Sequence, residues 1–551
     1  MLETTKIHSI AETENSRQVS HIHANVGSAQ AHKQRGSLLL IVLVTIIILS
    51  LSAYTFTALM QTEEEAARLV TKQLQSKCLA DSGMDFVRLY LSNSRLTIRE
   101  KGGLWDNPQY FQAIPVADGA TDPNNVGYFS VATSSLDEEG QADGQRFGLI
   151  DESSKINLNT LPHGEALLQL QGLEVRDILM TLPEMNEEIA DAILNWLDAD
   201  DDPRDFDSES GYYQSLDPAY DPKNGPMDSL DEMLLIRGVT PELLFGMDTN
   251  RNGLLDPEEM VGTDVSSTEA DMYLGWANYL TLYSNESNLT AEGLPRINVN
   301  GDDLEQLYDD LKSAFDDDWA NFIIYYRCSP EVPLSEPPPE TAVIQSGALL
   351  PIDFDNPEMV SKRKFDSIVD VVGSFVDTSA FDDSNLTSFA PSPVQFENRF
   401  MTMPTLMATL TTYEGATIPG RINIMQAPRL VLEGIPGVTP EMAQLIVERR
   451  GDDFELDDPD GADMNRKFET WLWVEDLVTL DEMQGLMSFI CTGGDVYQAE
   501  IVGYFADGIG TSRAEVVFDT TVPIPRILSW RNKSHLRASF SIDALGTNII
   551  E

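Results

Sequence analysis

An uncharged apolar run at residues 38–60 constrains this chain more than any other feature of its sequence. A helix that spans a bilayer needs about 20 apolar residues, and this run meets that length. Cleavable secretory signals have shorter apolar cores, of about 7–15 residues, and end at a small-x-small site that is lacking downstream of this run. Lys33 and Arg35 stand just before the run, so we expect the N-terminus in the cytoplasm and everything after residue 62 in the periplasm.

The helical pattern continues beyond the apolar run. Apolar side chains recur near a 3.6-residue period at Ala66, Ala67, Leu69, Val70, Leu74, Cys78, Leu79, Phe86, Val87, Tyr90 and Leu91. The pattern predicts a single helix of about 55 residues, apolar in its first half and amphipathic in its second. A plain single-pass anchor would not need this second half.

The charge of the chain excludes some partners. Its 551 residues are long enough for roughly three to four domains, and 42% hydrophobic residues predict that most of it is globular. The net charge is −54, from 90 acidic and 36 basic residues. Such a surface repels nucleic acid and anionic lipid and attracts divalent cations. We therefore expect no nucleic-acid partner.

The residue types of enzyme and zinc sites are scarce. Only His163 and His535 follow the apolar run, and the three cysteines, Cys78, Cys328 and Cys491, form no disulfide framework; separate buried thiols are favoured over one bridge. The sequence has no H-E-x-x-H, G-x-S-x-G, P-loop or dinucleotide-binding motif. Carboxylates are so frequent that pairs of them nominate no glycosidase site. These observations predict a protein without enzymatic activity.

The segment DTNRNGLLDPEE, residues 248–259, matches the calcium loop of an EF-hand. That loop needs oxygen ligands at positions 1, 3, 5, 9 and 12, a carbonyl at position 7 and Gly at position 6. The corresponding residues here are Asp248, Asn250, Asn252, Asp256 and Glu259 for the side chains, with Leu254 and Gly253. The short entering helix, 241–247, favours a static site. The pattern predicts calcium over the alternative of a solvated acidic turn.

A second acidic segment, DADDDPRDFDSE, covers residues 198–209 and has weaker spacing. Its candidate ligands are Asp198, Asp200, Asp202 and Glu209, but it lacks a glycine at the turn. A solvated acidic loop remains open as the alternative. The segment 457–465 is a third and poorer candidate. Carboxylates this dense repel one another, so a bound metal would stabilise these loops.

A short phrase, basic-Ile-Asn-apolar, occurs three times after the membrane segment, at residues 155–158, 296–299 and 421–424. Each copy leads to a helical segment, at 187–197, 317–326 and 440–450. An Asn side chain can satisfy backbone N–H groups at a turn or helix start, so we expect a strand, an Asn turn and helices in three related units. The third resembles a helix-hairpin-helix. Its acidic surroundings oppose DNA, which favours a packing role.

The start of the apolar run resembles that of type IV pilin-like proteins. The run begins directly after Gly36, and the resemblance implies cleavage between Gly36 and Ser37 by a prepilin peptidase, with methylation of the new N-terminus. Most members carry Glu at the fifth mature residue, where this chain has Ile41. That Glu neutralises a buried terminal amine of the neighbouring subunit, so a subunit without it is expected at a filament tip. Ser37 also departs from the usual Phe.

The segments DESSKINLNTL and ILNWLDADDDPRDFDSESGYY resemble the head of the K-type minor pseudopilin of type II secretion. The resemblance implies an α+β fold: a long pilin helix, a pilin-like α/β body with an antiparallel sheet, and a large inserted α-helical domain with helix-hairpin-helix-like units. It also implies that calcium is bound near 198–209. Alternating residues predict strands at 127–133, 145–152, 495–507, 512–521 and 525–533.

The expected domains follow from these features. They are a leader (1–36), a transmembrane and amphipathic helix (37–95), the first part of the body (96–150), the inserted helical domain with acidic calcium loops and a Pro-rich loop (151–420), and a helix-hairpin-helix-like unit with the strands that complete the body (421–551).

The K-type resemblance implies a function in protein export. The expected role is the tip subunit of the type II secretion pseudopilus, which initiates filament assembly in the inner membrane. The implied partners are the I- and J-type minor pseudopilins, the major pseudopilin and the prepilin peptidase, with secreted cargo or the outer-membrane secretin as further candidates. The alternative is an uncleaved, single-pass, calcium-dependent binding or adhesion protein.

Overall fold

The computed structural model describes most of the chain after the leader. The described residues are 35–116, 126–137, 140–170, 172–200, 202–206, 210–260, 273–331, 333–335, 338–339, 343–344, 352–381, 388–450, 463–536 and 539–547. They form two compact units, which we call the N-terminal segment (Met1–Arg68) and the head (Leu69–Glu551). Each unit is described by itself.

The N-terminal segment contains the first part of helix α1 (Arg35–Leu91). This is the helix among the described residues that is long and apolar enough to cross a membrane, with a mean hydropathy of 2.6 over its most apolar window. The side chains at residues 38–68 are exposed. The hydroxyl groups of Thr45 and Thr57 donate to the carbonyls of Val42 and Ala53, at 2.8 and 2.9 Å. These polar groups are therefore satisfied within the helix, as a lipid environment requires.

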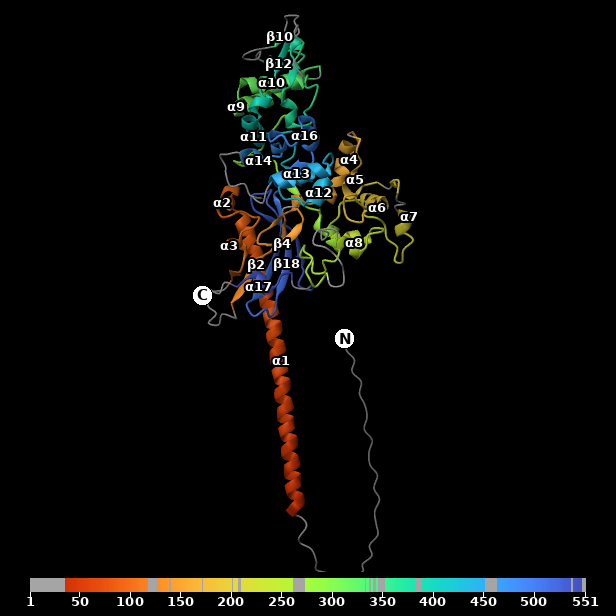
Figure 1. The fold of residues 1–551 in the computed structure, drawn as a ribbon, viewed down its shortest axis with the longest axis vertical. Coiled ribbons are helices and arrows are strands. Elements are labelled where there is room, and N and C mark those ends of the chain that lie inside the picture. Colours follow the sequence, from red (N-terminus) through yellow and green to blue (C-terminus); the bar gives the residue numbers. More distant parts are fainter. Residues whose placement is uncertain are drawn as a thin grey trace, which may run out of the picture. The chain divides into compact units, whose positions relative to one another are not determined.

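The head contains one six-stranded antiparallel sheet (Figure 1). The strand order is β1-β2-β17-β18-β19, and β5 also pairs with β17. The strand bounds are Ile114–Pro115 for β1, Gly127–Val131 for β2, Ile150–Asp151 for β5, Val496–Phe505 for β17, Ser512–Asp519 for β18 and Arg526–Asn532 for β19. Strands on both sides of the long helical region thus share one sheet, and the predicted antiparallel meander at the C-terminal end of the chain is confirmed.

The last turns of α1, from Leu69 on, pack against this sheet because small residues let the two backbones approach. A Cβ atom at Gly503 of β17 would lie 2.3 Å from the carbonyl oxygen of Ser76 in α1. A Cβ atom at Gly83 of α1 would lie 2.6 Å from the side chain of Ile501 in β17. Either position would reject a larger side chain without a shift of the helix. The cluster of buried residues between α1 and the sheet includes Val87, whose side chain is fully buried.

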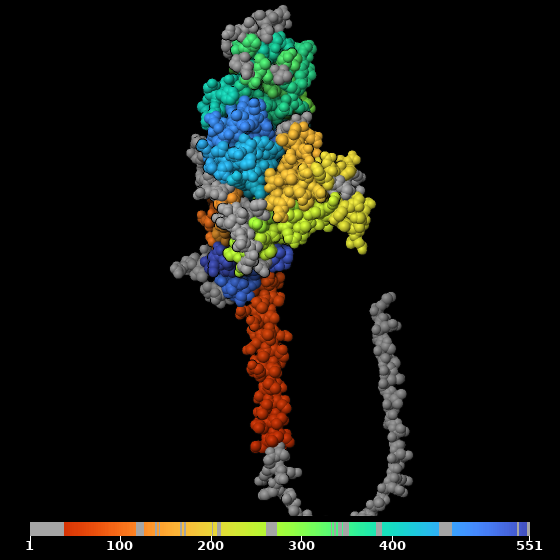
Figure 2. All heavy atoms as spheres, turned by 45° about the vertical axis from the view of Figure 1, so that its right-hand side comes forward, coloured from red at the N-terminus to blue at the C-terminus, as the bar shows by residue number. Residues whose placement is uncertain are grey.

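Three helical units lie between β5 and β17, and each begins with one of the repeated Ile-Asn phrases. Each phrase is a two-residue strand that pairs in parallel with a strand at the far end of its unit. The pairs are β6 (Ile156–Asn157) with β7 (Leu280–Thr281), β9 (Ile297–Asn298) with β13 (Leu410–Thr411), and β15 (Ile422–Asn423) with β16 (Ile490–Cys491). The prediction of three related units is therefore confirmed. Figures 1 and 2 show the second unit beside the third.

The three asparagines perform the same local task. The side-chain oxygens of Asn157, Asn298 and Asn423 each accept a hydrogen bond from the backbone N–H two residues further on, at 3.1, 2.9 and 2.9 Å. This is the Asx turn that the sequence predicts after each strand. The buried Arg327 and Arg450 of the second and third units also correspond, because each donates to carbonyl groups just after its Ile-Asn strand.

The helical segment predicted in each unit is present: 187–197 and 440–450 have the predicted bounds, and 317–326 extends to Cys328. The bounds are Leu161–Leu170 (α4), Val175–Leu179 (α5), Glu187–Leu197 (α6), Ser210–Tyr213 (α7) and Pro241–Phe245 (α8) in the first unit; Leu304–Ala314 (α9), Asp317–Cys328 (α10) and Arg399–Thr409 (α11) in the second; Arg429–Glu433 (α12), Pro440–Arg450 (α13), Asp463–Arg466 (α14), Trp471–Val474 (α15) and Leu480–Leu486 (α16) in the third. One large hydrophobic cluster, from Ile156 to Ile490, joins the three units.

Short elements complete the head. They are α2 (Arg95–Glu100), α3 (Pro108–Phe111) and α17 (Ile542–Leu545), the hairpin of β3 (Thr133–Leu136) and β4 (Ala142–Arg146), the pair β8 (Asn285–Ser287) with β14 (Thr417–Pro419), and the strands β10 (Val343–Ile344), β11 (Phe375–Asp377) and β12 (Ser388–Pro391).

The α+β class with a long N-terminal helix is confirmed, whereas the helix-hairpin-helix likeness stays a prediction. The three cysteines are free, as expected, but one expectation about them is wrong. Cys328 and Cys491 are buried, and Cys78 is exposed because it lies on the side of α1 that faces away from the sheet.

Candidate functional site: two acidic loops and the start of the long helix

The loop 248–259 follows the short helix α8. Thr240 caps this helix by accepting from the N–H of Leu243, and Gly246, at φ +63°, ends it. A Cβ atom at Gly246 would collide with the backbone near Tyr273, so only glycine fits this exit. The chain therefore enters the candidate calcium loop immediately after one turn of helix, as the short entering segment predicts.

The side-chain oxygens at loop positions 1, 3 and 5 are held by backbone N–H groups. Asp248 accepts from Gly253 and Asn252, at 2.8 and 3.1 Å. Asn250 accepts from Asn252, at 2.9 Å, and Asn252 accepts from Leu254, at 2.8 Å. Gly253 adopts φ +80°, the left-handed conformation that its position in the loop requires. The predicted spacing thus produces a compact turn with its oxygens directed along its own backbone.

The last two candidate ligands close the loop. Glu259 accepts from the backbone N–H groups of Thr249 and Asn250, at 2.8 and 3.2 Å, and from that of Asp256, at 3.2 Å. Asp256 accepts from the side-chain amides of Asn250 and Asn252, at 2.6 and 3.2 Å. The side chains of positions 1, 3, 5, 9 and 12 are therefore linked within one small loop.

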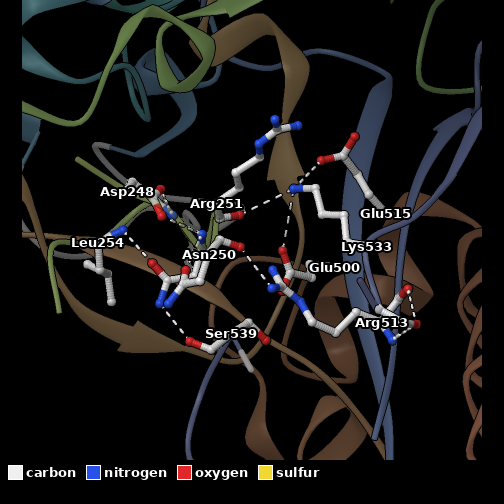
Figure 3. Close-up of polar contacts among 12 residues, drawn as sticks. Asp248, Asn250, Arg251, Leu254, Glu500, Arg513, Glu515, Lys533 and Ser539 are labelled. Atoms are coloured by element: carbon white, nitrogen blue, oxygen red, sulfur yellow. Dashed lines mark hydrogen bonds and ion pairs between the residues drawn. The ribbon is translucent and has the colours of Figure 1, made fainter. Parts of the chain in front are cut away.

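The outer side of the loop is attached to the C-terminal strands (Figure 3). The carbonyl of Asn250 accepts from Arg513 of β18, at 2.8 Å, and the carbonyl of Arg251 accepts from Lys533, at 3.2 Å. The side chain of Asn252 donates to the carbonyl of Ser539, at 2.6 Å. These anchors come from residues more than 250 positions away, and no local sequence signal could have indicated them.

The anchoring residues form a buried network of their own. Arg513 donates two hydrogen bonds to Glu500, at 2.7 and 3.0 Å, and Lys533 pairs with Glu515, at 2.6 Å. The flanking carboxylates hold the pKa of Lys533 above its usual value, although burial opposes this effect. The loop therefore rests on a charged but neutralised patch of the sheet.

Burial and a neighbouring carboxylate disfavour charge on Asp248. Its side chain is only 1% exposed, and burial, together with repulsion from Glu259, raises the pKa of Asp248 to about 7. A calcium ion would remove both costs, because it supplies positive charge to the same oxygens. The set of carboxylate, amide and carbonyl oxygens suits a hard cation, and so the residues of this loop fit calcium. Among the described residues, no group of three or more His, Cys, Asp or Glu side chains is gathered as a metal site.

The second acidic loop follows α6 and is organised differently. One carboxylate oxygen of Asp198 is buried without a hydrogen-bond partner, while its other oxygen accepts from Arg204, at 3.3 Å. Arg204 also binds Glu165 through two hydrogen bonds of 2.8 Å. Burial raises the pKa of Asp198 to about 6, with Arg204 opposing this effect. The orphaned oxygen fits a cation, but an arginine already occupies the neighbouring space.

The other residues predicted for the second loop contribute less. Asp200 accepts from the backbone N–H of Asp202, at 3.0 Å, and both belong to an exposed turn. Glu209 lies outside the described residues, as does most of the third candidate segment, 457–465. The structure therefore brings Asp198 close to Arg204 and Glu165, which the sequence pattern did not single out.

The predicted processing site lies at the start of α1. Gly36 and Ser37 are helical, and Ile41 lies on the same helix with its side chain exposed. The apolar side chains that follow are exposed throughout the N-terminal segment. A helix of this kind fits a single-pass membrane anchor, and no charged side chain interrupts residues 37–62.

Comparison with known proteins identifies part of the head. Residues 154–247 match the family model described as type II secretion system (T2SS), protein K. This segment is therefore similar to that family over 94 of the 551 residues of the chain. The predicted K-type resemblance is confirmed by it, and the match includes the second acidic loop. It ends one residue before Asp248, so the EF-hand-like loop lies just beyond the family segment.

A solved structure similar to this chain is "The Crystal Structure of the GspK-GspI-GspJ complex from enterotoxigenic Escherichia coli Type 2 Secretion System". The identity is 10% and the TM-score 0.32, over 86% of this chain and 98% of that chain. Comparison with the curated proteins finds no match. The family match supports a role as a type II secretion minor pseudopilin.

Proposed function

We propose that this chain is the tip subunit of a type II secretion pseudopilus and initiates its assembly. The observation that carries the proposal is the combination of a K-type segment in the head with α1, a helix of 57 residues whose apolar half is fully exposed. Exposed apolar side chains from residue 38 to residue 60 are costly in water and suit a bilayer or a bundle of similar helices.

Ile41 supports the position at the tip. An uncompensated charge among apolar helices is costly, so a subunit that receives a neighbour above it benefits from a carboxylate near its N-terminus. Ile41 cannot pair with a neighbour's terminal amine. The subunit would therefore begin a filament and not extend one. Its proposed partners are the I- and J-type minor pseudopilins and the major pseudopilin, with secreted cargo or the secretin as contacts of the head.

The proposed topology follows from α1 and the residues before it. The leader would lie in the cytoplasm, where a prepilin peptidase cuts between Gly36 and Ser37, and the head would lie in the periplasm. N-terminal sequencing of the protein extracted from membranes tests this directly. A chain that starts at Ser37 supports processing, whereas one that starts at Met1 favours the uncleaved adhesion protein.

A Gly36→Leu variant tests assembly and export together. We expect loss of the shorter, mature form and loss of exoprotein secretion, because the helix would keep its polar leader. Gly211→Leu is a matched control, since Gly211 is exposed in helix α7 and a Cβ atom there would lie in open space. Unchanged mature mass and unchanged secretion in the Gly36 variant would refute the proposed function.

Calcium is the proposed cofactor, and the two acidic loops are the proposed sites. The support is the ordered ligand set of loop 248–259 and the orphaned oxygen of Asp198 in the other loop. Calorimetric titration of the full chain in detergent with calcium tests both sites. Asp248→Ala and Glu259→Ala should each remove one binding event, and an unchanged stoichiometry would exclude the EF-hand-like site.

A further inference from the structure

Strand β19 is the open edge of the six-stranded sheet. It contains seven residues and, among the described strands, pairs with β18 alone. An edge strand presents unpaired N–H and C=O groups along its outer side, which is a ready template for another strand. Monomeric proteins usually guard such an edge with charges that point inward, with proline or with a covering segment.

A bulge in β19 places two large apolar side chains on one face. Phe518 pairs with Ile527, Val517 with Ser529 and Val516 with Trp530, so the register shifts at the residue between Ile527 and Ser529. Since Val516 and Phe518 share a face of β18, Ile527 and Trp530 share the same face of β19. Val516 and Phe518 belong to the core under α1, and the two β19 residues continue this apolar face outward.

These side chains are exposed. The exposed fractions are 38% for Ile527 and 43% for Trp530, and Ile524, in the turn before the strand, is 71% exposed. Aromatic residues of this kind, beside aliphatic ones, are enriched at the centres of protein interfaces. Among the described strands β19 is therefore unpaired along its outer side, and the face that carries Ile527 and Trp530 is apolar. On the other face, Arg531 pairs with Asp231, at 3.4 Å, and donates to Ser229, at 2.5 Å.

The electrostatics of this edge differ from those of the whole chain. Residues 520–542 contain no Asp or Glu, although the chain has 90 acidic residues. Exposed Arg88 of α1 donates to the carbonyl of Pro525, at 3.0 Å, just before β19 begins. Arg526 pairs with Asp519, but the arginine side chain is 61% exposed and the aspartate only 2%, so the arginine faces solvent. The start of the edge thus carries positive charge.

We propose that β19 is the docking edge for an extended acidic segment of a partner protein. The segment would add a strand to the sheet, place apolar side chains beside Ile527 and Trp530, and place carboxylates near Arg88 and Arg526. The positive charge at the start of β19 attracts carboxylates of the partner, and the acidic remainder of the surface repels them. Both effects direct an acidic segment to this edge. A second copy of the chain, with net charge −54, is disfavoured for the same reason. This inference adds a surface to the proposed function and does not depend on it.

The test uses the full chain in detergent and fluorescent peptides of the same length as β19. One peptide alternates Val and Glu, a second alternates Val and Gln, and a third is the acidic peptide with a central Pro. Fluorescence anisotropy should show saturable binding of the acidic peptide only. The Kd should rise several-fold at high salt, because the charges are exposed to screening. Equal binding of the Gln peptide would overturn the charge argument, and equal binding of the Pro peptide would overturn strand addition.

Variants of the edge locate the binding. Trp530→Lys should raise the Kd at least about tenfold, since it removes the aromatic contact and exposes a charge on the apolar face. Arg88→Gln should raise it about threefold, the size of one exposed charge contact. Val360→Lys is the control, because Val360 is also exposed but lies in the second helical unit. Unchanged melting temperatures show that each variant folds.

Three further outcomes would reject the proposal. The first is an unchanged Kd in Trp530→Lys. The second is self-association of the wild-type chain that Trp530→Lys abolishes, which would make a second copy the occupant. The third is binding to vesicles of anionic lipid, with no peptide binding, which would make the edge a membrane contact. Secretion and N-terminal processing are measured separately, so a failure here leaves the proposed function testable.

Discussion

The two acidic loops of the head have similar composition and different organisation. In loop 248–259, backbone N–H groups hold the oxygens of positions 1, 3 and 5, and the loop is attached to the sheet by Arg513, Lys533 and the Ser539 carbonyl. In the loop after α6, Arg204 pairs with Asp198, and one oxygen of Asp198 has no partner. The density of carboxylates is thus a poor guide to a site, and the spacing of glycine and amides is a better one.

The difference also lies in where each loop is anchored. The first loop joins the helical region to the six-stranded sheet, because its carbonyls accept from residues of β18 and of the segment after β19. The second loop is attached within the first helical unit, through Glu165. A cation in the first loop would therefore stabilise the contact between the hydrophobic core of the three helical units and the core between α1 and the sheet. A cation in the second loop would stabilise the first helical unit alone.

The largest effect is expected from Arg513→Met. It leaves buried Glu500 without its main partner and releases the carbonyl of Asn250, and breaking a buried ion pair typically costs about 3–5 kcal/mol. Urea unfolding of the full chain in detergent measures the loss. Lys312→Met is the control, because the pair of Lys312 with Asp317 is exposed and solvent screens such a pair, so its loss should barely change the free energy of unfolding. An equal loss of unfolding free energy in both variants would show that Arg513 stabilises the chain no more than an exposed ion pair does.

Proton binding distinguishes the two loops when calcium is removed by a chelator. The pKa of Asp248 is raised to about 7 and that of Asp198 to about 6, against about 3.9 in unfolded chains. For each aspartate, at pH values between its pKa in the unfolded chain and its raised pKa in the folded chain, the folded state binds more protons than the unfolded state. The free energy of unfolding therefore falls as pH rises through this interval. The slope for one group is about 1.4 kcal/mol per pH unit, or at most about 4 kcal/mol for Asp248.

The window between pH 6 and 7 belongs to the first loop. Asp248→Asn should flatten the fall of stability there and leave the fall below pH 6, to which Asp198 contributes. Asp198→Asn should flatten the fall of stability below pH 6 and leave the fall between pH 6 and 7. Melting temperatures of both variants and the wild type, recorded from pH 4 to 8 in chelator, check this. Parallel curves for the wild type and Asp248→Asn above pH 6 would contradict the expected protonation.

Calcium should stabilise the head mainly through the first loop. At a free calcium concentration about a hundred times the Kd, one site contributes about 2.7 kcal/mol. Glu259→Gln should abolish most of the calcium-dependent rise in melting temperature, because it removes the carboxylate at position 12. Asp200→Asn, in the exposed turn of the second loop, should leave most of that rise intact. A larger loss in Asp200→Asn would reverse the ranking of the loops.

Much of this arrangement could be predicted from local pattern. Helices α6 and α13 have the predicted bounds, since their caps and apolar spacing are local, and the directions of the Asp248 and Asn252 oxygens follow from the position of Gly253. The parallel pairing of β6 with β7 and the anchoring by Arg513 could not be predicted. Both join residues more than 100 positions apart, and nothing in the spacing of nearby residues encodes such contacts.

The smallest effect is expected from Arg204→Gln in the second loop. The arginine competes with a cation for Asp198 and Glu165, so its removal leaves both carboxylates without a positive partner. We expect calcium affinity at this loop to rise about fivefold, which corresponds to about 1 kcal/mol for a partly exposed ion pair. Arg204→Lys, which retains the charge, should leave the affinity nearly unchanged, and titration of both variants in an Asp248→Ala background isolates this site. A fall in affinity would instead mean that Arg204 holds the loop in its binding conformation, and the two loops would then share the same dependence on a basic anchor.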